Sequence, residues 1–179
     1  MPASLGRIFN KRLLLRLAAL AVLIALYYYI VDWAPLQTGL RRLVAVVLGL
    51  FGRGSSATVS AGTPSLLMAD GRVYAFTENC AYVALYLLAA PFIWRFGRPI
   101  ASNLIRQAAF AAGLLALDIV RLTAAILLNQ GGAPWKRVHD IPDLAIHIAV
   151  MALAVLSALR ADDPEAAQRS KTTRPSTIV

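Results

Sequence analysis

The chain has 179 residues, of which 59% are hydrophobic and only 15% are charged. A soluble domain of this size has too little interior to bury so much apolar surface, so the composition excludes an ordinary soluble protein and favours one partly solvated by lipid. The formal net charge is +9. Lys and Arg stand beside apolar runs rather than along one polar face, which argues against nucleic-acid binding.

The first apolar run, Leu13–Val31, follows Lys11 and Arg12. It is longer than the apolar region of a cleaved signal peptide and no small-residue cleavage site follows it, so we expect an uncleaved first span. The tyrosines at 27–29 lie near the C-terminal end of this run, where aromatic rings favour the lipid headgroup region. Arg16 is within reach of the near end, where we expect it to snorkel.

A shorter apolar stretch, Leu40–Phe51, comes next and is flanked by Arg41, Arg42 and Arg53. A membrane-crossing helix needs about 20 apolar residues, and this stretch has fewer. It is predicted to be an interfacial or re-entrant helix whose arginines contact lipid phosphates.

Two short strand-prone runs follow within residues 63–77. Ser65–Met68 and Arg72–Phe76 flank Ala69-Asp70-Gly71. Asp-Gly between two such runs is typical of a tight turn, so this segment is predicted to be a β-hairpin outside the membrane.

Three further spans are predicted at about residues 79–94, 107–128 and 141–159, with Asp140 as the N-cap of the last. The polar tail, 161–179, is predicted to be disordered. The sequence therefore predicts an all-α membrane protein with about four transmembrane helices, one interfacial helix and a small extracytoplasmic β-hairpin. Residues 1–160 are expected to form a single domain.

Orientation follows from the positions of Lys and Arg in the short flanks. The N-terminal segment, the 95–106 connection and the tail from Arg160 are basic, whereas the 129–140 loop holds only Lys136 and Arg137. We expect the basic side, with both termini, to be cytoplasmic in a prokaryotic inner membrane. The hairpin and the 129–140 loop then face the periplasm or cell exterior.

This topology places three reactive side chains at similar depth: Cys80, Arg121 and His139. An arginine within an apolar helix costs at least about 2.5 kcal/mol, so it is paired or functional. Asp118, three residues earlier on the same helical face, is its expected partner. The alternative is that Asp118 and Arg121 are only a structural staple.

Cys80 is the chain's one cysteine, so no intramolecular disulfide is available. At a helix start, beside an imidazole and a guanidinium, it has the setting of a reactive thiolate. Together the three groups suit attack on an amide, with Cys80 as nucleophile, His139 as general base and acid, and Arg121 at the oxyanion or a substrate carboxylate. A lone cysteine at a helix end is otherwise an ordinary packing residue.

His139, Asp143 and His147 share one helix face, which suggests a metal or haem site as a further alternative. The two histidines lie about 12 Å apart along the axis, too far for one ion to bind both easily. A site formed by Cys80, His139 and Asp143 stays open. His139 is also interpretable as a loop residue of a headgroup-binding rim with Trp135.

The order of these features resembles the exosortase/archaeosortase family of membrane cysteine transpeptidases. The matching segments lie within residues 63–148 and are Glu78-Asn79-Cys80-Ala81-Tyr82, Asp118-Ile119-Val120-Arg121 and Val138-His139-Asp140. The family commonly has Ser-Gly after the cysteine and Asn three residues before the arginine, where this chain has Ala81-Tyr82 and Asp118. The chain is also shorter than many members, with fewer spans.

The resemblance implies a thiol protease that cleaves C-terminal sorting signals of exported proteins at the outer membrane boundary, through a thioester resolved by an amine or water. Cys80, Arg121 and His139 are the implied catalytic residues, with Asp118 and Asp140 in support. We expect no cofactor. The expected partners are the lipid bilayer and exported substrates that carry a C-terminal helix. The competing hypothesis is a non-enzymatic membrane assembly or scaffold subunit of an envelope or polysaccharide export system.

Overall fold

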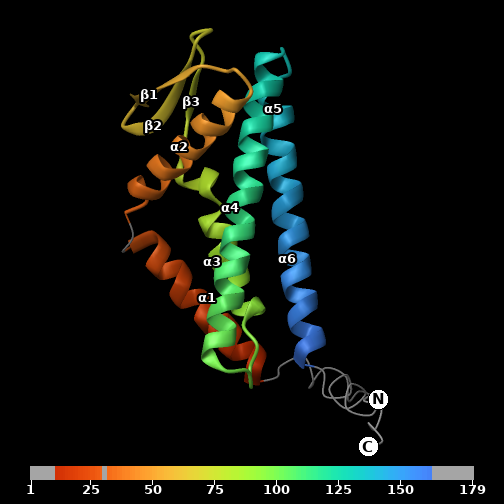
Figure 1. Ribbon diagram of the computed structural model, residues 1–179. Coiled ribbons are helices and arrows are strands. Elements are labelled where there is room, and N and C mark those ends of the chain that lie inside the picture. The colour runs from red at the N-terminus through yellow and green to blue at the C-terminus, as the bar shows by residue number, and fades with distance from the viewer. Residues whose placement is uncertain (1–10, 30–31, 163–179) are drawn as a thin grey trace, which may run out of the picture.

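The computed structural model describes residues 11–29 and 32–162 and consists mostly of helices that carry a small sheet at one end (Figure 1). In chain order the elements are α1 (Lys11–Tyr29), α2 (Ala34–Leu50), β1 (Ser55–Ser60), β2 (Thr63–Met68), β3 (Val73–Ala75), η2 (Glu78–Ala81), α3 (Val83–Ile93), α4 (Ile100–Gln130), α5 (Trp135–Val138) and α6 (Asp140–Asp162). We call the end with the strands the sheet end. α1 begins and α6 ends at the opposite end.

Among the residues that the structure describes, three helical segments are long and apolar enough to cross a membrane: Lys11–Tyr29, Ile100–Gln130 and Trp135–Arg160. The expected fourth span at 79–94 is not confirmed, because its helix, α3, has only 11 residues. At about 1.5 Å per residue α3 is about 16 Å long, roughly half of a bilayer core. The left-handed backbone of Tyr82 starts it late, and the extended Trp94 ends it.

The predicted hairpin is confirmed as β2 and β3, which pair antiparallel with Leu66 opposite Tyr74. Gly71 in the connecting turn has φ of +83°, a conformation that favours glycine. The sequence analysis missed β1, which pairs with β2 and makes a three-stranded sheet in the order β1-β2-β3. Its sequence, Ser-Ser-Ala-Thr-Val-Ser, has little of the β-branched and aromatic character that reveals a strand.

α2 begins at Ala34, six residues before the predicted start, because Pro35 in its first turn is compatible with a helix. Its buried face consists of Leu40, Val44 and Leu48, which join residues of β2, β3 and α4 in one hydrophobic cluster. Its other face is exposed and apolar, with Val46 64% and Leu50 81% accessible. The helix therefore packs the sheet against α4 and leaves an apolar face on the outside.

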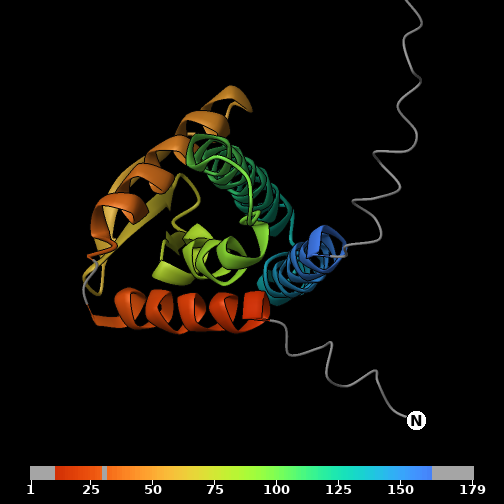
Figure 2. The same ribbon diagram turned by 90° about the horizontal axis from the view of Figure 1, so that it is seen from below.

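Away from the sheet, α3 lies at the centre of the helices, surrounded by α1, α4 and α6 (Figure 2). Small residues bring α3 and α6 together, with Ala89 of α3 in a cluster with Ala154 and Ala158 of α6. Arg16 does not snorkel as expected. It is only 2% exposed, donates a hydrogen bond of 2.9 Å to the Trp94 carbonyl and also contacts the Pro91 carbonyl, so it ties α1 to the end of α3.

The expected tail at 161–179 overlaps α6, which continues through Asp162. The remaining tail, 163–179, lies outside the described residues, as do residues 30–31 of the first predicted span.

Candidate active site

Cys80 is the third residue of η2, the short turn that connects the sheet to α3. Its side chain is 8% exposed and packs in the cluster of α2, sheet and α4 residues, beside Leu66 and Leu122 among others. The sulfur lies 3.4 Å from the Thr77 hydroxyl, and the Cys80 amide donates to the Thr77 carbonyl at 3.0 Å. The thiol is thus held in a fixed position under the sheet rather than at an open mouth.

Burial by itself raises the pKa of the Cys80 thiol, but interactions with the His139 imidazole and the Thr77 hydroxyl outweigh it. The net effect is a pKa below the ordinary value of a cysteine. A thiolate is the nucleophilic form of cysteine, so these neighbours favour reactivity.

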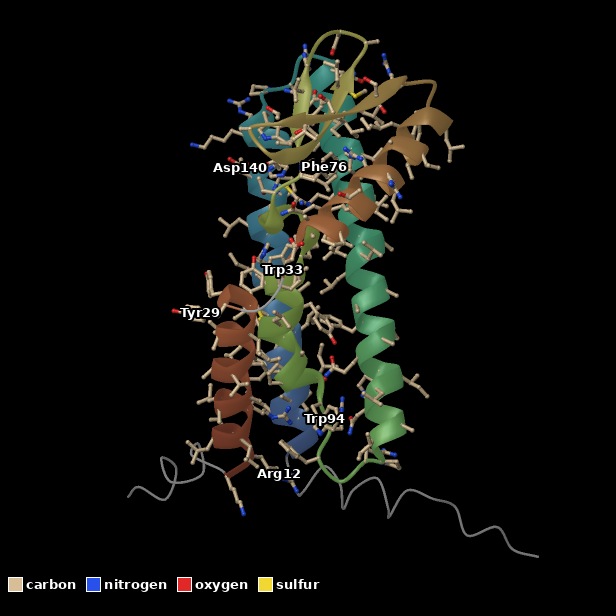
Figure 3. All side chains as sticks on the ribbon, turned by 90° about the vertical axis from the view of Figure 1, so that its left-hand side faces the viewer. Arg12, Tyr29, Trp33, Phe76, Trp94 and Asp140 are labelled. Carbon is tan, nitrogen blue, oxygen red and sulfur yellow. The ribbon has the colours of Figure 1, made fainter. Side chains whose placement is uncertain are left out.

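His139 lies between α5 and the first turn of α6, at the sheet end, where Figure 3 labels the neighbouring Asp140. Its Nδ1 lies 2.9 Å from a carboxylate oxygen of Asp140, and its ring stacks on Trp135 with 4.6 Å between centroids. Asp140 is therefore the first residue of α6 and an orienting partner of His139, rather than the predicted N-cap. With Nδ1 on a carboxylate, Nε2 is the nitrogen available for proton transfer.

His139 Nε2 is buried and makes no hydrogen bond of ordinary geometry within the described part of the chain, although the imidazole and the Cys80 thiol interact electrostatically. The two groups are therefore near each other but not aligned as a tight pair. Catalytic hydrogen bonds are often loose before substrate binds, so the absence of a tight bond does not exclude a nucleophile and its base.

Arg121 lies in the last third of α4, and three side chains contact its guanidinium. Its Nη2 is 2.8 Å from Asp118, the pair that the spacing predicts, and its Nη1 is 3.0 Å from Asp143 of α6. Its guanidinium also lies over the Tyr82 ring at 4.8 Å. Asp118 is fully buried, and two carboxylates so close to one guanidinium offset the cost of placing that charge among apolar helices.

Tyr82 connects the Arg121 guanidinium to the cysteine, because Tyr82 follows Cys80 by two residues in the chain. Its φ of +47° turns the chain from η2 into α3, a conformation that costs a bulky residue about 1–3 kcal/mol. Its buried ring contacts both Arg121 and the edge of the His147 ring. The turn that follows Cys80 is therefore held by the Tyr82 ring, over which the Arg121 guanidinium lies.

The structure thus brings Cys80 and His139 together at the sheet end, with Arg121 and Asp118 close by in α4. Sequence reasoning missed the role of Asp143 as a second partner of Arg121, although it noted that Asp143 shares a face with His139. The spacing of His139, Asp143 and His147 suggests a metal site only as an alternative, whereas the structure pairs the Asp143 carboxylate with the Arg121 guanidinium. Thr77 was missed because a lone hydroxyl three residues before a cysteine carries no distinctive signal.

The metal alternative gains nothing from the geometry. Among the residues that the structure describes, no group of three His, Cys, Asp or Glu side chains is arranged to bind a metal ion. His147 Nδ1 instead donates a hydrogen bond of 2.9 Å to the Asp143 carbonyl oxygen within its own helix.

Comparison with known proteins returns no match: no family model fits the chain, and no curated protein or solved structure is significantly similar to it. The geometry of the site is therefore the basis for the proposed function.

Proposed function

We propose that the protein is an exosortase-like membrane cysteine transpeptidase or endopeptidase that uses Cys80, His139 and Arg121. The observation that carries the proposal is the pairing of a thiol of lowered pKa with an imidazole whose other nitrogen is bound to a carboxylate. Thiol, imidazole and carboxylate in this order are the components of cysteine protease sites on unrelated folds.

In the proposed reaction, Cys80 attacks the scissile carbonyl and its proton passes to His139. His139 then protonates the departing amine, which leaves a thioester between the sulfur and the exported part of the substrate. An amine or water attacks the thioester and releases the cysteine. Arg121 supplies positive potential for the oxyanion, while Asp118 and Asp143 hold the guanidinium in place.

The membrane placement is part of the proposal. The basic end, opposite the sheet, faces the cytoplasm, and the sheet end faces outward. α2 lies in the outer interface with its exposed Val46 and Leu50 in the lipid, and α3 enters the bilayer only part of the way. The thiol then lies at the outer boundary, where the segment preceding a substrate's membrane helix emerges.

The backbone at Tyr82 supports kinship with the exosortase/archaeosortase family. The family commonly has glycine at the second position after the cysteine, and Tyr82 stands at that position with φ of +47°. Glycine adopts this left-handed conformation at no steric cost. A left-handed turn at this position would suit the family's glycine, and this is the basis on which the Tyr82 backbone supports the proposed kinship.

The proposal is tested by co-expressing the protein with reporters fused to the C-terminal apolar segments of proteins exported by the same organism. We expect at least one reporter to be shortened by the natural chain and to remain full length with Cys80→Ala. His147→Ala serves as a control, because His147 contacts Asp143 and Tyr82 but not the thiol. Shortening that persists with Cys80→Ala would rule out the proposed nucleophile.

The non-enzymatic alternative is a membrane scaffold subunit in which Cys80 is a packing residue. The burial of the sulfur side chain among Leu66 and Leu122 favours it. It predicts that Cys80→Ala behaves like a small cavity mutant, with lower stability but unchanged function of the export system.

A further inference from the structure

The backbone N–H of Cys80 is already occupied. Attack of a thiolate on an amide places negative charge on the carbonyl oxygen, and hydrogen-bond donors must stabilise this oxyanion. In serine proteases one of these donors is the N–H of the nucleophile itself. Here the Cys80 N–H donates to the Thr77 carbonyl at 3.0 Å and closes the η2 turn. The direct donors to an oxyanion must therefore come from another residue.

The guanidinium of Arg121 is also engaged at each of its nitrogens. Its Nε and Nη2 lie 3.3 and 2.8 Å from Asp118 Oδ1. Its Nη1 lies 3.0 Å from Asp143. Arg121 therefore contributes positive potential to the site, while a donor in direct contact with the sulfur is better placed to bond the oxyanion.

The Thr77 hydroxyl is such a donor. Its Oγ1 lies 3.4 Å from Cys80 Sγ, and this is the only hydrogen bond of that hydroxyl among the described residues. A threonine before a helical turn ordinarily accepts a hydrogen bond from an N–H two or three residues later. Thr77 holds that position but makes no such bond. Its hydroxyl is thus directed to the nucleophile instead of the backbone.

The backbone of Thr77 supplies a second donor. It interacts with the Cys80 thiol and lowers the pKa of that thiol. Only a donor favours the charged thiolate, so the interacting group is the Thr77 N–H and not its carbonyl. This N–H makes no backbone hydrogen bond within the described part of the chain. One residue therefore presents a hydroxyl and an amide to the same reacting atom.

Thr77 lies on the open side of the thiol. It is exposed, whereas the apolar side chains that pack around Cys80 are buried. Figure 3 labels Phe76, the residue before Thr77, at the same height as Asp140. Asp140 directly follows His139, so the donors and the base lie at one level of the molecule. A substrate carbonyl that approaches the sulfur passes beside Thr77.

We propose that Thr77 is a catalytic residue whose hydroxyl and backbone N–H stabilise the oxyanion, a role that rests on the proposed function. In the resting site the hydroxyl donates to the thiolate. As the sulfur bonds to the carbonyl carbon, the electron pair of the C=O π bond moves to oxygen, and the hydroxyl turns to donate to that oxygen. Thr77 transfers no proton, because His139 holds the one taken from Cys80. When the pair returns, the C–N bond breaks and the amine leaves with that proton.

The test compares two reactions of Cys80 in the full chain in nanodiscs, each followed by mass spectrometry of the Cys80 adduct. Iodoacetamide alkylates the thiolate without forming an oxyanion, whereas 4-nitrophenyl acetate acetylates it through one. Both need the thiolate, so the ratio of the two rates is insensitive to a change in the pKa. Thr77→Val should lower the ratio of acetylation to alkylation about tenfold to a hundredfold, as for one lost oxyanion donor. Thr77→Ala should act alike, and Thr77→Ser, which keeps the hydroxyl, should retain the ratio.

Thr123→Val is the matched control, because it removes a buried hydroxyl that makes no hydrogen bond among the described residues. It should leave the ratio unchanged. An unchanged ratio in Thr77→Val, or an equal fall in Thr77→Ser, would overturn the proposal. Neither reagent is a polypeptide, so the ratio is measured independently of proteolysis. A ratio lowered in Thr77→Val without any Cys80-dependent shortening of a reporter would support the Thr77 donors and contradict the protease.

Discussion

Arg121 of α4 and Asp143 of α6 form an ion pair of 3.0 Å that joins two of the three helices long enough to cross a membrane. Asp118 holds the same guanidinium from within α4. The pair therefore fixes both the helix packing and the position of the cation beside Tyr82. Its contribution is separable from that of Asp118 because the two carboxylates contact different nitrogens.

Asp143→Asn should lower the free energy of unfolding by about 1–3 kcal/mol, because the buried Arg121 guanidinium loses one of its two carboxylate partners. For a chain of this size that corresponds to a fall in Tm of about 3–10 °C in detergent or nanodiscs. The control is Asp70→Asn, because the Asp70–Arg72 pair is at the surface and 3.5 Å long. That change should move the Tm by no more than about 2 °C, and equal effects of both would contradict the structural role of Asp143.

The lowered pKa of Cys80 predicts how its alkylation depends on pH. Thiolate reacts with iodoacetamide, so the rate should rise with pH and reach its midpoint below that of an ordinary cysteine. His139→Ala removes a neighbour that lowers the pKa but leaves the burial that raises it, so the midpoint should move to higher pH. His147→Ala is the matched control, because the chain has 2 histidines and only His139 interacts with the thiol. A profile that is identical in all three proteins would contradict the Cys80–His139 pair.

The sheet is anchored to the end of α4 through Asn129. The Tyr74 hydroxyl donates to the Asn129 side-chain oxygen at 2.8 Å, and Arg72 contacts the Asn129 carbonyl. Asn129→Leu should therefore loosen the sheet and speed hydrogen exchange of β2 and β3 amides about fivefold to tenfold, as expected for one lost hydrogen bond. Leu128→Ala, at a neighbouring 55% exposed position, should leave the exchange unchanged.

The proposed orientation predicts which segments are accessible from outside the cell. Cys80→Ala removes the only cysteine, so single cysteines can then be placed at Ser56 of β1 and at Arg98, both exposed. A membrane-impermeant maleimide should label Ser56→Cys in intact spheroplasts and label Arg98→Cys only after lysis. The reverse pattern would place the thiol on the cytoplasmic side.

Most of the helices and strands are predictable from the sequence, because a lipid environment restricts a long apolar segment to few structures. A run of about 20 apolar residues predicts a membrane-spanning helix, so the candidate spans at α1, α4 and α6 follow from hydropathy, and the Asp-Gly turn identifies β2 and β3. The hydropathy of residues 79–94 is equally high, yet no apolar pattern reveals that Tyr82 adopts a left-handed conformation and shortens the helix to 11 residues.

For the candidate site, the sequence predicts only the depth of each side chain in the membrane and not the contacts between them. The topology expected from the sequence predicts that Cys80, Arg121 and His139 lie in one layer, but which of these groups touch depends on how each helix is rotated about its axis. That is why the Arg121–Asp143 pair and the Thr77–Cys80 contact emerged only from the structure. Arg16 illustrates the same limit, since a residue within reach of the interface turned inward to bind backbone carbonyls instead.

The central claim is that Cys80 forms a thioester with a polypeptide, and hydroxylamine tests it most directly. A reporter that the natural chain shortens is processed in membranes with neutral hydroxylamine present, and the exported fragment is analysed by mass spectrometry. Because hydroxylamine attacks thioesters in place of the natural amine or water, we predict a fragment that ends in a hydroxamate, absent with Cys80→Ala. A shortened fragment with an ordinary carboxylate end at saturating hydroxylamine, or a hydroxamate that persists without Cys80, would contradict the account.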